Sequence, residues 1–187
     1  MEKNKTRQMA VSAMIGALYT VLCLGFAPFS FGAVQVRLAE ALTLLPIFSP
    51  FAVVGVTLGC AVSNLVGAMT GANILGLWDI PLGTLATFLA GICTWKLRNV
   101  RLSTRFGSIP WLAPLPPVLF NALIIGAELT VMMTSGSWNT GIFLINALQV
   151  GIGQIVSCYA VGLPFAVVLD RTGVARRCFG PIEHKAG

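Results

Sequence analysis

The stretch from Ile80 to Met133 decides the fold, because it places a basic loop between two long apolar runs. Residues 80–95 read IPLGTLATFLAGICTW, residues 96–105 read KLRNVRLSTR, and residues 112–133 read LAPLPPVLFNALIIGAELTVMM. An α-helix needs about 20 apolar residues to cross the hydrocarbon layer of a membrane. The stretch therefore predicts two membrane-spanning helices joined by a positively charged loop.

The composition of the whole chain agrees with a membrane protein rather than a soluble domain. The chain has 187 residues, of which 56% are hydrophobic and only 10% are charged, and its mean hydropathy is +0.86. Soluble domains carry about 25% charged residues. A net charge of +6 would otherwise suggest nucleic acid as a partner, but the basic residues form clusters between the apolar runs. We therefore expect no nucleic-acid partner.

Working outward from the central loop, we predict an all-α, polytopic membrane protein with a single domain over residues 1–187 and six transmembrane helices. The second segment is short and begins with charged residues. The sixth is longer than one crossing requires, so it is tilted or is broken near Gly151, Gly153 or Pro164. The predicted segments are residues 8–28, 37–49, 51–70, 80–97, 112–134 and 141–169.

Lysine and arginine predict the orientation of these segments. Every basic residue except Arg37 lies in the N-terminal tail, the central loop or the C-terminal tail. Positive charge marks the cytoplasmic side of a membrane protein, so we expect both termini and the central loop inside. Four crossings before the central loop and two after it satisfy this condition. The connections at residues 29–36, 71–79 and 134–140 are then expected outside.

Four ionisable residues lie at or within the predicted membrane region: Arg37, Glu40, Asp79 and Glu128. Each costs about 2.5–3.5 kcal/mol at the centre of an inserted helix, so such residues usually face a cavity or a partner. Arg37 and Glu40 are three residues apart and can pair on one helix face, which can also be a purely structural feature. If they pair, Asp79 and Glu128 remain as surplus negative charge. That surplus favours a cationic ligand or one rich in N–H donors.

Polar side chains on the later segments indicate a cavity in the outer half of the bundle. Asn121 lies two helical turns before Glu128 on the same side of the fifth segment, and Asn146 and Gln149 are three residues apart on the sixth. Together they offer acceptors and donors to a polar ligand. The alternative is a protonated Glu128 that hydrogen-bonds to a neighbouring helix, with amides that only join helices.

Motifs for nucleotide binding and for catalysis are missing from the sequence. There is no GxxxxGK[ST], HExxH or GxSxG, and the one histidine, His184, lies in a polar tail. We therefore expect no enzyme activity, no metal site and no cofactor bound by this chain. A chain that binds a solute without an ATP site can draw its energy from partner subunits. The alternatives are a stand-alone proton-coupled carrier that uses Glu128 or Asp79, and a structural membrane subunit without a ligand.

Several runs in the chain resemble those of one transporter family. They are QVRLAEALTLLP at 35–46, Gly59-Cys60 with Ser63-Asn64, DIPLGTLAT at 79–87, and Gly153-Gln154. Over residues 8–170 the chain resembles the QueT family, the substrate-binding S-components of energy-coupling factor (ECF) transporters, a type of ABC transporter, for queuosine precursors.

The resemblance implies a six-helix S-component in the cell membrane of a prokaryote, with both termini cytoplasmic. It implies queuine or an aminomethyl-deazaguanine as the ligand. The guanine-like N–H edge and the amine of such a molecule suit a site with two spare carboxylates. The resemblance also implies that the first helix docks on the transmembrane coupling subunit EcfT through the AxxxA pair Ala13 and Ala17. Two partner ATPase subunits are then expected to use the ATP.

On this interpretation the predicted binding residues have separate roles. Glu128 and Asn121 hold the N–H edge of the base, Asp79 faces the ammonium group, and Trp78 stacks on the ring. The Arg37–Glu40 pair shapes the first outside loop. The full predicted set is Glu128, Asn121, Asp79, Trp78, Arg37, Glu40, Asn73, Asn146 and Gln149.

Overall fold

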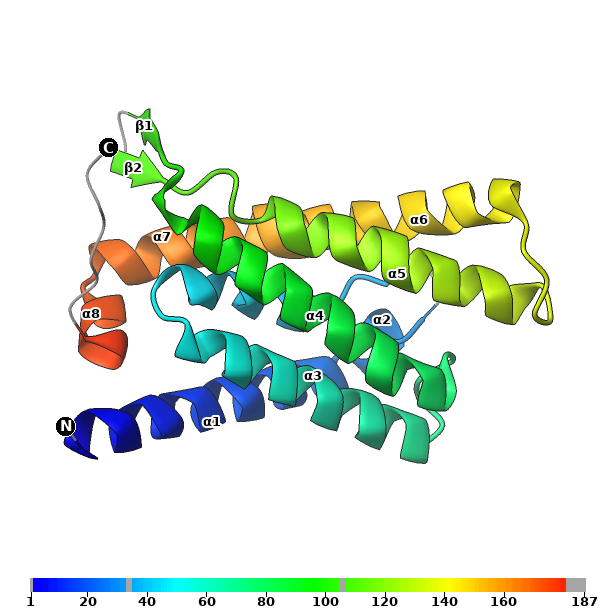
Figure 1. Cartoon of the computed structure of the whole chain (residues 1–187), viewed down its shortest axis with the longest axis horizontal. Helices are drawn as coiled ribbons and strands as arrows, with labels where there is room; N and C mark the ends of the chain where they lie inside the picture. The colour runs from blue at the N-terminus through cyan, green and yellow to red at the C-terminus, as the bar shows by residue number, and fades with distance from the viewer. Residues whose placement is uncertain (1, 33–34, 105–106, 181–187) are drawn as a thin grey trace.

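The structure, a computed structural model, describes residues 2–32, 35–104 and 107–180, and its helices lie side by side along one long axis (Figure 1). A two-stranded antiparallel hairpin in the central loop departs from the all-α prediction. The elements in chain order are α1 (Glu2–Gly25), α2 (Ala27–Ser30), η1 (Leu38–Ile47), α3 (Phe51–Met69), η2 (Gly76–Trp78), α4 (Asp79–Lys96), η3 (Leu97–Asn99), β1 (Leu102–Thr104), β2 (Gly107–Ile109), α5 (Leu115–Met133), α6 (Thr140–Ile155), η4 (Val156–Gly162), α7 (Leu163–Arg171) and α8 (Val174–Phe179).

Five helical segments in the described part of the chain are long and apolar enough to cross a membrane. They are residues 5–25, 51–69, 76–99, 115–133 and 140–171, and each overlaps one of the predicted segments. The remaining predicted segment, 37–49, holds η1, a ten-residue 3₁₀ helix rather than an α-helix of spanning length. The predicted count of six transmembrane helices is therefore not confirmed.

The 3₁₀ helix η1 occupies the centre of the bundle. All its residues except Leu38 are buried, and it contacts α1, α3, α4, α7 and η4. A 3₁₀ helix rises about 2.0 Å per residue, so ten residues extend about 20 Å, further than an α-helix of the same length. Around η1, consecutive pairs from the series α1, α3, α4, α5 and α6 pack against each other.

Helices α1 and α3 are in close contact. A β-carbon at Gly59 would lie 2.8 Å from the carbonyl oxygen of Gly16, and one at Gly55 would lie 2.7 Å from that of Ser12. The two backbones can approach this closely only because glycine has no side chain. Gly16 therefore faces the bundle, whereas Ala13 and Ala17 are exposed on another side of α1.

The two ends of the bundle differ in charge. The start of α1, the hairpin and α8 lie at one end, on the left of Figure 1, which we call the basic end. Its basic residues within the described ranges are Lys3, Lys5, Arg7, Lys96, Arg98, Arg101, Arg171, Arg176 and Arg177; Arg105, His184 and Lys185 lie outside the described residues. The start of α1, the central loop and α8 thus lie at the same end of the bundle, as the predicted topology requires. The placement of this end in the cytoplasm stays a prediction.

The long sixth segment is one continuous helical run with an irregular middle. A seven-residue π-helical stretch, η4, separates α6 from α7 and ends just before Pro164. Proline removes a backbone donor and its ring clashes with the carbonyl four residues earlier, and a widened turn relieves both effects. Of the three predicted break points, the irregularity lies next to Pro164.

The interior of the bundle holds charged and polar side chains, whereas large apolar side chains are exposed on its surface. Glu40, Asn64 and Asp79 are 0% exposed, whereas Met9 is 72% and Leu148 is 65% exposed. In water this arrangement would be unfavourable, because apolar surface would remain hydrated and charged groups would be desolvated. In a lipid bilayer the exposed side chains match their solvent, and the buried polar groups are expected to hold each other or a ligand.

Candidate functional site

At the end opposite the basic end, Asp79 is the centre of a buried hydrogen-bond network. Its Oδ2 accepts hydrogen bonds from Nη2 of Arg37 at 3.0 Å and from Nδ2 of Asn73 at 2.7 Å. Its backbone carbonyl accepts one from Nδ2 of Asn64 at 2.7 Å. An acidic residue in the first turn of α4 is also stabilised by the helix dipole. The network joins the segment before η1, helix α3 and the loop before α4.

Arg37 is held from several sides and is only 2% exposed. Its Nε donates to the carbonyl of Ser30 at 3.4 Å, and its guanidinium lies 5.3 Å from the centre of the Phe31 ring. The predicted pairing of Arg37 with Glu40 is wrong. Arg37 precedes η1 in an extended conformation, so its side chain reaches Asp79, 42 residues further along the chain, instead of following the helix face of Glu40.

Glu40 is bonded to hydroxyl groups instead. Its Oε1 accepts from the Tyr19 hydroxyl at 2.5 Å and from the Thr87 hydroxyl at 3.4 Å. These donors come from α1 and α4, so Glu40 fastens η1 to two of the surrounding helices.

The charge balance therefore differs from the predicted one. Asp79 is neutralised by Arg37, and its other oxygen, Oδ1, packs against Gly83 so closely that a β-carbon there would overlap it. The predicted role of Asp79 as the partner of an ammonium group loses its basis, because no spare charge is left on it. Glu128 differs from Asp79 in this respect. Among the described residues, it is the carboxylate that borders a groove and forms no ion pair.

Glu128 lies in the second half of α5 and is 5% exposed. Both of its carboxylate oxygens are buried, and neither has a hydrogen-bond partner among the described residues. The side chain borders a groove of about 590 Å³ between the start of α4 and the end of α5. The residues that line the groove are Trp78, Leu82, Leu123, Ile124, Ala127, Glu128, Val131 and Met132.

The other predicted binding residues lie in different places. Trp78 is 68% exposed and lines the groove with Glu128. Asn121 donates to the carbonyl of Pro117 within its own helix at 3.0 Å, and Asn146 donates to the Thr130 hydroxyl at 3.1 Å, which joins α6 to α5. Gln149 is half-buried on α6. The structure thus brings Trp78 and Glu128 together in one groove, while Asn121 and Asn146 are engaged in bonds to the protein.

Sequence reasoning missed both the second set of polar residues and the walls of the groove. Asn64 donates to Asp79, whereas Tyr19 and Thr87 donate to Glu40. All three are 0% exposed, and a search for every polar residue inside an apolar run could have found them. The groove could have been outlined from Glu128 by helix spacing, since Ile124 and Met132 are four residues before and after it.

The chain is similar in sequence to known transport proteins. The family model described as QueT transporter matches residues 9–171. The queuosine precursor transporter QueT of Lactococcus lactis subsp. cremoris (strain MG1363) is 34% identical over 68 residues, which cover 35% of this chain and 40% of that protein. The aligned stretch thus spans less than half of that relative. No solved structure matches the chain.

Proposed function

This chain belongs to the QueT transporter family, and on that premise we propose that it is the substrate-binding S-component of an ECF-type importer for a queuosine precursor. Its ligand is queuine or an aminomethyl-deazaguanine, captured outside the cell membrane of a prokaryote and released into the cytoplasm. The observation that supports this proposal is the Glu128 carboxylate, which is buried beside a groove without a hydrogen-bond partner among the described residues.

The chemistry of a deazaguanine edge suits this carboxylate. The ring N–H and the exocyclic amino group of such a base point in the same direction, side by side. A carboxylate carries two acceptor oxygens in one plane and can accept both hydrogen bonds. Both oxygens of Glu128 lack a partner in the described structure. A bound base therefore removes the penalty that the unpaired buried carboxyl group otherwise imposes.

The rest of the groove suits a flat aromatic ring. Its volume of about 590 Å³ lies within the range of about 300–1,000 Å³ that is usual for small-molecule sites. Its walls are apolar apart from Glu128, and Trp78 offers an indole face for stacking. Trp78 directly precedes Asp79, so the network of Asp79, Arg37 and Asn73 fixes the backbone that presents it.

Calorimetric titration of the purified full-length chain tests the site. Wild-type protein is titrated with queuine, with aminomethyl-deazaguanine and with adenine, which lacks the paired donors. Glu128→Gln retains the shape but replaces one acceptor with a donor, and we expect it to bind the two deazapurines at least about tenfold more weakly. Asp170→Asn is the matched control, because it removes a carboxylate at the basic end. Equal affinity of wild type and Glu128→Gln would exclude Glu128 from the site.

Coupling to ATPase partners is the second part of the proposal. The exposed Ala13 and Ala17 form a smooth strip on α1, and small residues of this kind let another helix approach closely. We propose that this strip docks on an EcfT-like transmembrane subunit, which is driven by two ATPase subunits. Ala13→Leu/Ala17→Leu should leave ligand affinity unchanged and abolish uptake in cells. Uptake at the wild-type rate would remove this strip from the coupling surface.

The alternative function, a stand-alone proton-coupled carrier, makes the opposite prediction. Proteoliposomes that contain only this chain should then accumulate the deazapurine under an imposed proton gradient without ATP. Our proposal predicts binding but no accumulation in that assay. Accumulation would overturn the S-component assignment and leave the Glu128 binding site intact.

A further inference from the structure

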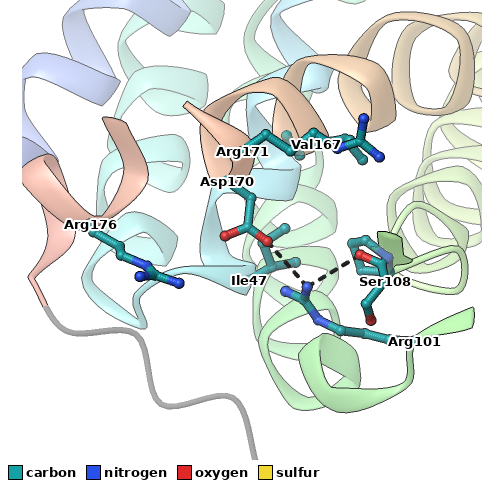
Figure 2. A pocket seen from close by; sticks show the side chains of 9 residues that line it. Ile47, Arg101, Ser108, Val167, Asp170, Arg171 and Arg176 are labelled. Carbon is teal, nitrogen blue, oxygen red and sulfur yellow. Dashed lines mark hydrogen bonds and ion pairs between the residues drawn. The ribbon is translucent and has the colours of Figure 1, made fainter. Parts of the chain in front are cut away.

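A second hollow lies at the basic end, between the hairpin, α7 and α8 (Figure 2). Its volume is about 320 Å³, and the side chain of Ile47, at the end of η1, contributes to its wall. The polar residues that line it are Arg101, Ser108, Asp170, Arg171 and Arg176. This hollow is far from the Glu128 groove along the bundle and shares no lining residue with it.

Arg101 is fixed in position inside the hollow. Its Nη1 donates to Oδ2 of Asp170 at 3.2 Å and to the carbonyl of Ser108 at 3.5 Å, as the dashed lines in Figure 2 show. Its side chain is only 12% exposed. Asp170 and the Ser108 carbonyl thus hold this guanidinium in place at the wall of the hollow, where its positive charge favours a phosphate or carboxylate group.

The remaining charges leave the hollow positive. Three arginines face it and the one acidic residue of the lining is Asp170. Gly173, with φ of +72°, turns the chain between α7 and α8, so Arg171 and Arg176 come from two different helices on either side of Asp170 (Figure 2). Both of these arginines are exposed and can reach an anion in the opening. The positive-inside distribution explains basic residues at this end, but it does not require that they surround one concavity.

We propose that this hollow binds the phosphate group of an anionic phospholipid in the leaflet at the basic end. The end of a membrane-spanning bundle lies at the depth of the lipid headgroups, and basic pockets between helices there suit anionic lipids. The wall also contains the apolar Ala166 and Val167. The inference is independent of the transported substrate.

Thermal unfolding of the purified full-length chain in detergent, with added lipid, tests the proposal. Phosphatidylglycerol should stabilise the wild type in a saturable way, and phosphatidylcholine should do so only at much higher concentration. Arg171→Gln/Arg176→Gln should raise the half-saturating concentration of phosphatidylglycerol about tenfold or more. Lys96→Gln/Arg177→Gln is the control, because it removes the same charge at the same end from residues that do not line the hollow. This control should respond as the wild type does.

Three results would overturn the proposal. An equal loss in the Lys96→Gln/Arg177→Gln control would mean that the lipid responds to the diffuse charge of the basic end. Equal stabilisation by the two lipids would mean that the hollow does not select an anionic headgroup. Stabilisation by inorganic phosphate at the same concentration as phosphatidylglycerol would assign the hollow to a free anion instead of a lipid. Failure of any of these arms leaves the deazapurine titration at Glu128 unaffected.

Discussion

Asp79 and Glu128 are both carboxylates buried near the same end of the bundle, yet their surroundings are opposite. Asp79 has an arginine and an asparagine on one oxygen and an asparagine on its backbone carbonyl. Glu128 has no hydrogen-bond partner among the described residues and faces a groove of about 590 Å³. Both lie near the start of α4, since Asp79 opens that helix and Leu82, three residues further along, lines the groove with Glu128.

The difference separates a structural charge from an available one. A buried ion pair is strongly destabilising only when one partner is removed, so the Asp79 network is expected to govern folding. An unpaired buried carboxylate weakens the fold in the absence of a ligand, and proteins tolerate such groups mainly where function requires them. We therefore expect variants of the network to change stability and variants of the groove to change affinity.

The largest effect is expected for Asp79→Ala. It leaves Arg37 charged and buried without a counter-ion, which should lower the free energy of unfolding by about 3–5 kcal/mol. Arg37→Met/Asp79→Leu removes both charges and should recover most of that loss. Thermal unfolding of the purified variants measures both, and expression in the membrane fraction reports variants that do not fold. A double variant as unstable as Asp79→Ala would show that the ion pair is not the source of the effect.

Glu128→Leu should have the opposite sign in the absence of ligand. Replacing an unpaired buried carboxylate with an apolar side chain should raise the free energy of unfolding by about 1–3 kcal/mol, while the stabilisation by added deazapurine disappears. The measurement is the melting temperature with and without ligand. A lower melting temperature of the ligand-free variant would show that Glu128 has a structural partner and belongs with Asp79.

The sequence predicts the arrangement of the helices better than the contacts of the charged residues. The apolar runs predict the five long helices. The basic clusters predict that the start of α1, the hairpin and α8 lie at one end of the bundle. Both patterns are visible in the sequence because the lipid bilayer determines helix length and the side on which positive charge accumulates. The segment 37–49 is different. Its length and charge are visible in the sequence, but its 3₁₀ geometry results from burial on every side, which depends on the helices around it.

The candidate site shows the same division. Glu128 stands out in the sequence because an acidic residue in an apolar run needs a reason, and the structure places it beside a groove. The partner of Arg37 could not be found by helical spacing, since Asp79 is 42 residues away and is brought near by tertiary packing. The mistaken pairing with Glu40 gave Asp79 a spare charge that the structure does not support.

A smaller effect is expected for Asn73→Ala, which tests whether the network fixes the loop before α4. The variant removes the donor to Asp79 and the acceptor for the backbone N–H of Leu75, at 2.7 Å and 3.0 Å. The free energy of unfolding should fall by about 1–2 kcal/mol, and hydrogen exchange of the η2 backbone should become faster. Asn99→Ala, at an exposed position in η3, is the control and should change neither quantity. Unchanged exchange at η2 would separate this loop from the network.

The smallest effect is expected for Trp78→Leu, which keeps an apolar wall but removes the stacking face. Because Trp78 is 68% exposed, the melting temperature of the ligand-free protein should not change. Affinity for the deazapurine should fall by about 0.5–1.5 kcal/mol, or roughly two- to twelvefold. Intrinsic fluorescence gives a second measurement, since ligand stacked on the indole should quench the wild type more than this variant.

Trp138→Leu is the matched control: Trp138 is 57% exposed and packs against Phe143, outside the groove. An equal loss of affinity in both variants would mean that Trp78 contributes only as an anchor at the membrane interface. The groove would then bind its ligand through Glu128 without a stacking partner.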